Sequence, residues 1–290
     1  MSATPDAQAT AAMAGSPDAH MNKKLGFTAM ILSATGMGLV GTFGRLATPI
    51  DPVTGAKYIT GDFLAFGRMT TGAIGMLVII LAVRKMATLR TTRLSFSVVA
   101  GGLAIGTSLA LYVSSTLMTT IANAVFLIYT GPLFSAILAW IFLKERITPR
   151  KMGFLALVFV GMVLVIGILN YSTGLGFTVG FDFGSDPELP NKSTGDLFGL
   201  ASGLFYGLAL FFYRYRGDVA SEVRAFWNFV FGAVGAITVM VFRINALDPT
   251  NPLDVMTATN WWWAIGMFLI CGLFAIGLLV VAGKHLLAVE

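Results

Sequence analysis

Cysteine, histidine and charged residues are scarce in this sequence. It contains one cysteine, Cys271, and two histidines among 290 residues, and charged residues make up only 11%. A single cysteine excludes a disulfide framework and a cysteine-based metal site, and two histidines leave little for metal or catalytic-triad chemistry. No Asp or Glu is expected deep in an apolar run. We therefore expect no enzymatic active site, no metal, no cofactor and no coupling through a buried carboxylate.

Apolar residues are what the sequence has in excess. The hydrophobic fraction is 56% and the mean hydropathy is +0.81, which is more than a water-soluble domain can accommodate. A helix needs about 20 apolar residues to cross a bilayer. Eight such runs predict an all-α polytopic membrane protein in contact with lipid, with no nucleic-acid partner despite its net charge of +5. The runs lie near residues 25–47, 63–83, 96–117, 119–143, 149–170, 195–214, 221–242 and 261–283.

Lys and Arg fall in alternate connections between these runs. The connections on the same side as the N-terminus contain fourteen Lys and Arg residues. The connections on the opposite side contain only Arg45, Lys57, Lys192 and Arg243. Because Lys and Arg accumulate on the cytoplasmic side, we expect a multi-pass protein of the cell (inner) membrane with a cytoplasmic N-terminus. Residues 1–22 are rich in Ala, Ser, Thr and Pro and are expected to form a disordered tail. The loop 171–194 is expected to be external.

Comparison of the chain with itself indicates an internal repeat. Residues 31–45 align without gaps on residues 200–214, and residues 72–75 match residues 232–235. Five runs precede the second copy, and an odd number of crossings turns that copy upside down. The sequence therefore predicts inverted five-helix repeats, an architecture of secondary transporters.

The two repeats are predicted over residues 23–170 and 195–290. The alignment places Arg68 on Asn228 and Gly106 on Gly272, so the sequence reaches Glu290 where the last two helices of the second repeat are expected to begin. Eight helices are then present of an expected ten.

The fourth run has a distinctive order of residues. Ala122-Asn123-Ala124 is followed, after Val125, by FLIYTGP and then LFSAILAWIFLKE. Together with five-helix repeats and Arg68 near the start of the second helix, this pattern resembles the EamA-type members of the drug/metabolite transporter superfamily. The resemblance implies ten helices that move small metabolites, often outward, by alternating access. A Trp-Gly pair is usual in the first helix of such proteins, and Val40-Gly41 stands in its place here.

Arg68 is the main candidate contact for a substrate. A charge inside a span marks a functional site by default, although a long side chain can also snorkel to the outer interface. If Arg68 faces a cavity, its forked donors suit a carboxylate or phosphate group.

Asn123 and Thr130 are expected to share a helix face, seven residues apart. Gly131 and Pro132 interrupt the same helix and are the predicted hinge. These features indicate a helix that lines a cavity, and the alternative is that both polar side chains bond a neighbouring helix as packing contacts. The predicted substrate-binding residues are Arg68, Tyr112, Asn123, Phe126, Thr130, Tyr206, Trp227 and Asn228.

The leading hypothesis is a secondary transporter that exports small metabolites such as amino acids. The alternative is a truncated or non-transporting membrane protein, which needs a homodimer or another partner to complete its cavity.

Overall fold

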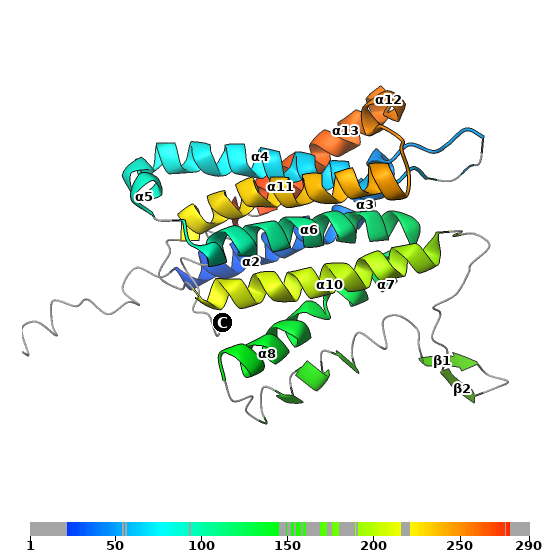
Figure 1. Ribbon diagram of the computed structural model, residues 1–290, viewed down its shortest axis with the longest axis horizontal. Coiled ribbons are helices and arrows are strands. Elements are labelled where there is room, and N and C mark those ends of the chain that lie inside the picture. Colours follow the sequence, from blue (N-terminus) through cyan, green and yellow to red (C-terminus); the bar gives the residue numbers. More distant parts are fainter. Residues whose placement is uncertain are drawn as a thin grey trace, which may run out of the picture.

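The described part of the chain is a bundle of helices that lie roughly side by side along its longest axis (Figure 1). The computed structural model describes residues 22–53, 55, 57–92, 94–144, 149, 152–153, 155–157, 159–160, 169–172, 176–179, 189, 191–215, 221–275 and 277–278. The helices are α2 Lys23–Gly38, α3 Val40–Ala47, α4 Gly61–Ala82, α5 Met86–Thr91, α6 Phe96–Met118, α7 Ile121–Ile128, α8 Gly131–Phe142, α10 Lys192–Tyr215, α11 Ser221–Ala246, α12 Pro252–Val255, α13 Ala258–Met267 and the π-helix η2 Phe268–Phe274.

Six of the predicted membrane spans are confirmed as helices that are long and apolar enough to cross a bilayer. They are Lys23–Ala47, Gly61–Ala82, Phe96–Met118, Ile121–Phe142, Lys192–Tyr213 and Val223–Ala246. The predicted span 261–283 corresponds to a shorter apolar helix, Ala258–Phe274, within the described residues. The predicted span 149–170 lies mostly outside them.

A small β-hairpin occupies a region for which only a helix end and a loop were predicted. Strand β1, Leu169–Ser172, pairs antiparallel with β2, Gly176–Val179, so that Leu169 lies opposite Val179. The last two residues of the predicted span 149–170 therefore belong to a strand. Tyr171 and Thr178 are residue types that favour strands, and a helical period cannot be distinguished reliably from a strand in so short an apolar run.

Two of the spans are interrupted near their middle. The first changes from α2 to α3 at Leu39, and the fourth changes from α7 to α8 at Tyr129 and Thr130. Pro132 lies in the first turn of α8 and has no amide hydrogen to give to the carbonyl four residues earlier, so a new helix begins there. The predicted Gly-Pro break is thus present in the structure.

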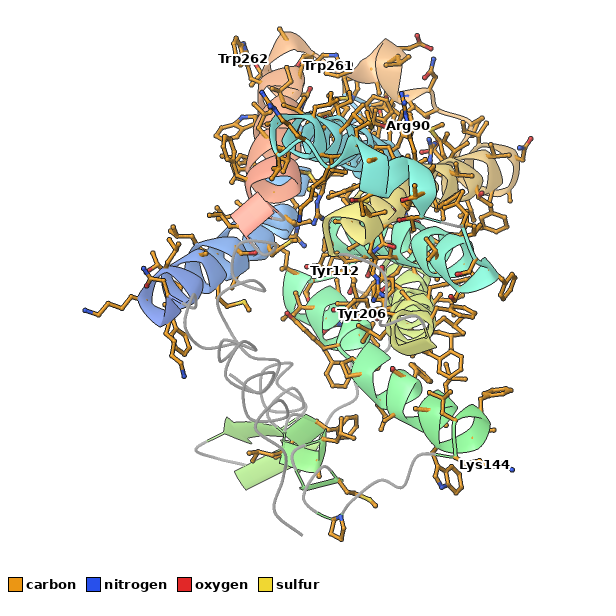
Figure 2. All side chains as sticks on the ribbon, turned by 90° about the vertical axis from the view of Figure 1, so that its left-hand side faces the viewer. Arg90, Tyr112, Lys144, Tyr206, Trp261 and Trp262 are labelled. Atoms are coloured by element: carbon orange, nitrogen blue, oxygen red, sulfur yellow. The ribbon has the colours of Figure 1, made fainter. Side chains whose placement is uncertain are left out.

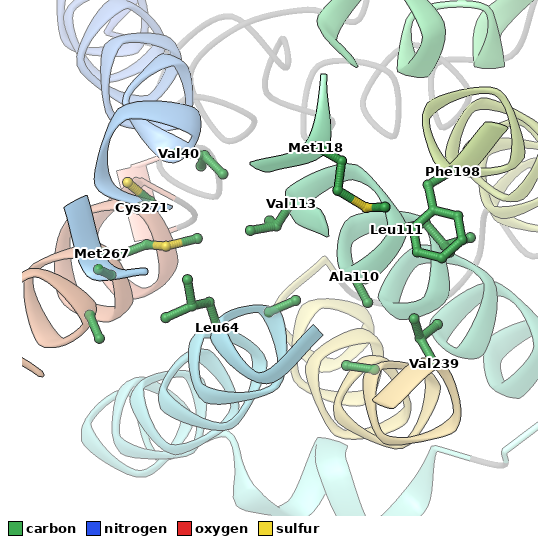
Figure 3. Close-up of a cluster of buried hydrophobic side chains, with 14 residues drawn as sticks. Val40, Leu64, Ala110, Leu111, Val113, Met118, Phe198, Val239, Met267 and Cys271 are labelled. Carbon is green, nitrogen blue, oxygen red and sulfur yellow. The ribbon is translucent and has the colours of Figure 1, made fainter. Parts of the chain in front are cut away.

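Helices α4, α6 and α11 form the centre of the bundle together with α10 and η2. Buried Leu64 on α4, Val113 on α6 and Met267 on α13 belong to one apolar cluster, which lies between these helices in Figure 3. Buried serines bond across two of the helix pairs. Ser33 on α2 donates to the carbonyl of Ala275 at 2.6 Å, and Ser108 on α6 donates to the carbonyl of Ser202 on α10 at 2.8 Å.

Glycine makes the closest of these helix contacts possible. A Cβ atom added to Gly106 on α6 would overlap the backbone of Gly232 on α11, whereas a Cβ atom added to Gly38 would meet nothing within 4 Å. Small residues at helix contacts let backbones approach, which is how membrane helices gain packing energy.

We expect Gly106→Ala to destabilise the protein by about 1–3 kcal/mol, because α6 and α11 must separate to admit the methyl group. The matched control Gly38→Ala should be neutral or more stable by up to about 1 kcal/mol, since alanine favours a helix more than glycine does. Thermal unfolding of both purified variants in one detergent measures the difference. Equal stability of the two variants would contradict this packing.

Candidate substrate-binding site

Arg68 lies in the interior of the bundle, in the third turn of α4. Its side chain is 2% exposed. The Nε atom donates to the carbonyl of Cys271 at 3.0 Å, and Nη2 lies 3.0 Å from the sulfur of Met37. The guanidinium therefore reaches from α4 to η2 and α2. The alternative that it snorkels to the interface is wrong.

A π-helix provides the carbonyl that Arg68 uses. Cys271 lies within η2, and a Cβ atom added to the next residue, Gly272, would stand 3.0 Å from Arg68 Cγ. The wider turn of a π-helix changes which carbonyls are bonded along the helix, and such turns are frequent at functional sites. Gly272 and the π-turn together let η2 approach the arginine closely.

Arg68 differs from a second buried arginine, Arg243 at the end of α11. Arg243 is 1% exposed, and its Nε atom lies 2.7 Å from Oδ2 of Asp62, which is fully buried. Among the described residues, Arg68 has bonds to a carbonyl and a thioether, and no carboxylate lies within ion-pair distance. A buried cation without an anion is costly in an apolar medium. Arg68 is therefore the described side chain best placed to attract an anionic group.

Two of the predicted tyrosines are linked to this arginine, Tyr112 directly and Tyr206 only through Tyr129. Tyr112 on α6 is close enough for electrostatic interaction with both Arg68 and Tyr129, and Tyr206 on α10 interacts in the same way with Tyr129. Tyr206 also covers Gly131, where an added Cβ atom would stand 2.6 Å from its ring. Figure 2 labels Tyr112 and Tyr206, whose helices α6 and α10 pack against each other. We call Arg68, Tyr112 and Tyr206 the Arg–Tyr cluster.

Tyr129 was missed by sequence reasoning. It is the residue at which α7 ends, and its side chain is 51% exposed. The hydroxyl group of its neighbour Thr130 made that residue the predicted contact, but a tyrosine beside a Gly-Pro pair is an equally visible signal in the sequence.

The other predicted residues of the fourth span lie apart from Arg68. Thr130 donates to the carbonyl of Leu127 at 2.6 Å and faces Gly203 on α10. Phe126 packs on Phe159 with ring centroids 6.0 Å apart. These contacts are those of helix packing, which was the alternative interpretation of Thr130.

Asn123 belongs to a polar group at one end of the bundle. Its Nδ2 atom lies 3.5 Å from Oδ1 of Asp196, which also accepts a 2.7 Å hydrogen bond from Thr119. This end contains Ala47 and Gly61, and we call it the outer end after the orientation predicted from Lys and Arg. Asn123 therefore lies toward the outer end, away from the helix break.

Trp227 and Asn228 pack between α11 and α6. Trp227 stacks on Phe231 with centroids 5.6 Å apart, and Asn228 hydrogen-bonds Tyr213 through its side chain. The indole nitrogen of Trp227 and the amide oxygen of Asn228 have no hydrogen-bond partner among the described residues. The structure does not join these two residues to the Arg–Tyr cluster.

Two carboxylates are buried near the ends of spans, although the sequence predicted only that no acid lies deep in an apolar run. Asp62 is 0% exposed and Asp196 is 2% exposed. Both occur in the first two turns of a helix, where the helix dipole favours a negative charge. Their nearness to the run ends made them look like interfacial residues in the sequence.

A pocket of about 380 Å³ opens at the outer end, between the loops that follow α3 and α11. Asp51, Lys57 and Asp248 are its charged lining residues. Burial and the nearby Arg45 lower the pKa of the Lys57 ammonium group. The pocket lies over the bundle and does not include the Arg–Tyr cluster.

The long apolar helices define a multi-pass membrane protein, and a family comparison gives the class. Residues 24–167 match the EamA-like transporter family, in agreement with the resemblance seen in the sequence. This match indicates a membrane transporter of the drug/metabolite type. No curated protein matches the chain. A solved structure described only as "Crystal structure of protein" is 20% identical, covers 89% of this chain and 84% of its own, and has a TM-score of 0.50, which supports the fold alone.

We expect the two buried arginines to respond differently to replacement by methionine. Arg243→Met leaves Asp62 buried without its partner and should cost about 3–5 kcal/mol. Arg68→Met removes a cation that lacks a carboxylate and should stay within about 1 kcal/mol of the parent protein. Thermal unfolding in one detergent measures both. If Arg68→Met is as damaging as Arg243→Met, Arg68 is a structural residue.

Proposed function

We propose that this protein exports small metabolites that carry a carboxylate group, such as amino acids, and that Arg68 anchors that group. One observation carries the proposal. Arg68 is buried among three helices and near a tyrosine, and no carboxylate of the described residues lies within ion-pair distance of it. A substrate carboxylate would supply the missing negative charge through two parallel hydrogen bonds.

We also infer that the chain contains two inverted repeats that exchange an inward-open and an outward-open state. Reciprocal contacts between α4 and α11 support this inference. A Cβ atom added to Gly72 would overlap Phe229, and one added to Gly232 would stand 2.9 Å from the sulfur of Met69. In the alignment of Arg68 with Asn228, Gly72 corresponds to Gly232 and Met69 to Phe229. A two-fold axis between the helices predicts this exchange of partners.

A second reciprocal contact involves the third helix of each repeat. A Cβ atom added to Gly75 on α4 would overlap Leu273 in η2, and one added to Gly235 on α11 would stand 2.8 Å from the backbone nitrogen of Thr107 on α6. The alignment pairs Gly75 with Gly235 and Leu273 with Thr107. The same register thus accounts for contacts on both sides of the proposed axis.

The interrupted helices are the elements proposed to deform during transport. Tyr206 and Tyr129 flank the break beside Gly131 and Pro132. A helix break absorbs backbone rotation at low cost because local hydrogen bonds are already absent. Movement of α7 and α8 at this break would therefore open or close access to the Arg–Tyr cluster.

The test is substrate exchange in liposomes that contain the purified full chain. A panel of radiolabelled amino acids and small carboxylic acids should include at least one compound that exchanges with its unlabelled form. Arg68→Met should raise the half-saturating concentration of that compound roughly tenfold or more, because charge-assisted hydrogen bonds are lost. Arg68→Lys should lose less, since it keeps the charge.

Arg90→Met is the matched control, because Arg90 is exposed on the short helix α5. It should leave exchange unchanged. Exchange that is restricted to compounds without a carboxylate, or that survives Arg68→Met with unaltered half-saturation, would refute the role of Arg68.

A further inference from the structure

A buried ion pair closes the outer end of the bundle between α4 and α11. Arg243 Nε lies 2.7 Å from Asp62 Oδ2. Arg243 Nη1 also donates to the carbonyls of Asp248 and Thr250 at 2.8 and 3.0 Å. One arginine therefore ties the first turn of α4 to the last turn of α11 and to the loop that follows. We call this ion pair the outer clamp.

Other hydrogen bonds between spans gather at the same end. Arg45 donates to the carbonyls of Thr116 and Thr119 at 2.9 and 2.8 Å. The hydroxyls of Thr48 and Thr60 are 2.9 Å apart. The outer ends of the first three spans are therefore held together by polar bonds in this structure.

The sequence repeats the charges of the outer clamp at the opposite end of the same two helices. Asp62 is the second residue of α4, and Glu222 is the second residue of α11. The register that pairs Arg68 with Asn228 pairs Asp62 with Glu222. It pairs Arg243 with Val83, the neighbour of Arg84. Each helix thus begins with an acid. Arg84 follows the end of α4, and Arg243 lies in the last turn of α11.

The two helices run in opposite directions, and this places Glu222 and Arg84 at one end. Gly72 on α4 contacts Phe229 on α11, and Met69, one turn earlier, contacts Gly232, later on α11. The end of α4 therefore lies toward the beginning of α11. The Arg84 side chain is exposed at this inner end.

We propose that the two acid–arginine pairs are reciprocal gates of the transport cycle, with the outer clamp holding the outer end shut and Glu222 pairing with Arg84 when the outer end opens. The proposal rests on the inverted repeats and alternating access proposed above. In the outer-closed state the outer clamp is bonded between the helices, and in the outer-open state the pair of Glu222 and Arg84 would be bonded instead. The loss of one ion pair is then offset by the gain of the other, so neither state is strongly favoured.

The experiment compares two buried positions on α4, one near each end. Leu64 is 0% exposed near the outer clamp, and Ile80 is 1% exposed near the inner end. Each is replaced by cysteine, one at a time, in a Cys271→Ser background. The rate of labelling by a water-soluble maleimide is measured on the purified full chain, in detergent and in liposomes.

Neutralising the outer clamp should open the outer end. Asp62→Asn should speed labelling at Leu64→Cys by roughly tenfold or more and slow it at Ile80→Cys. Glu222→Gln should have the opposite effect, or leave the outer position as slow as in the parent. The charge exchange of Asp62→Arg with Arg243→Asp should restore slow labelling at the outer position.

Controls separate gating from unfolding and from the proposed function. Asp254→Asn and Arg90→Gln change exposed charges at the two ends and should alter neither rate. Unfolding would speed labelling at both positions together. If Asp62→Asn and Glu222→Gln change the two rates in the same direction, or change neither, the gates are refuted. If labelling responds as expected but the protein exchanges no carboxylate compound, the proposed substrate class is refuted and the proposed gates still stand.

Discussion

The high free energy of a charge in apolar surroundings governs the interior of this protein. Each of three arginines inside or beside the spans meets that constraint differently. Arg243 is bonded to the carboxylate of Asp62, and Arg45 donates to two backbone carbonyls near the outer surface. Arg68 lies farther from a helix end than the other two, and its described partners are a carbonyl and a sulfur atom. Because weak neutral acceptors offset little of the desolvation free energy, a charge so placed is costly for stability, which supports the proposed role of Arg68 in binding a ligand.

The backbone around Arg68 departs from regular helix on two sides. The first span is interrupted at Leu39, two residues beyond Met37, and the eighth becomes a π-helix around Cys271. Regular helices would present to the guanidinium carbonyls that are already hydrogen-bonded within the helix, together with larger side chains. The absence of a side chain at Gly272 lets η2 lie against α4 at this level. Close backbone packing and the buried charge therefore depend on each other.

The sequence predicted the helical spans and the Gly-Pro break because both follow from local rules of apolar length and proline chemistry. It left open which way Arg68 points, since both outcomes satisfy the same spacing along α4. The burial of Asp62 was missed for a related reason. An acid at the start of a helix is normally hydrated, and only the approach of Arg243, far away in the chain, removes it from water. Long-range packing also separated Thr130, which faces Gly203, from the Arg–Tyr cluster.

The proposed repeats are alike in their gates and unlike in their centres. The register that relates Asp62 to Glu222 keeps an acid at the start of both helices, so the two ends of the α4–α11 pair have matching charges. The same register relates Arg68 to Asn228, which exchanges a cation for a neutral amide. Asn228 hydrogen-bonds Tyr213, and Trp227 beside it stacks on Phe231, so this side is filled by packing. In the proposed cycle, matching ends would let the two states have similar free energies, while Arg68 would give a substrate carboxylate one place to bind in both states.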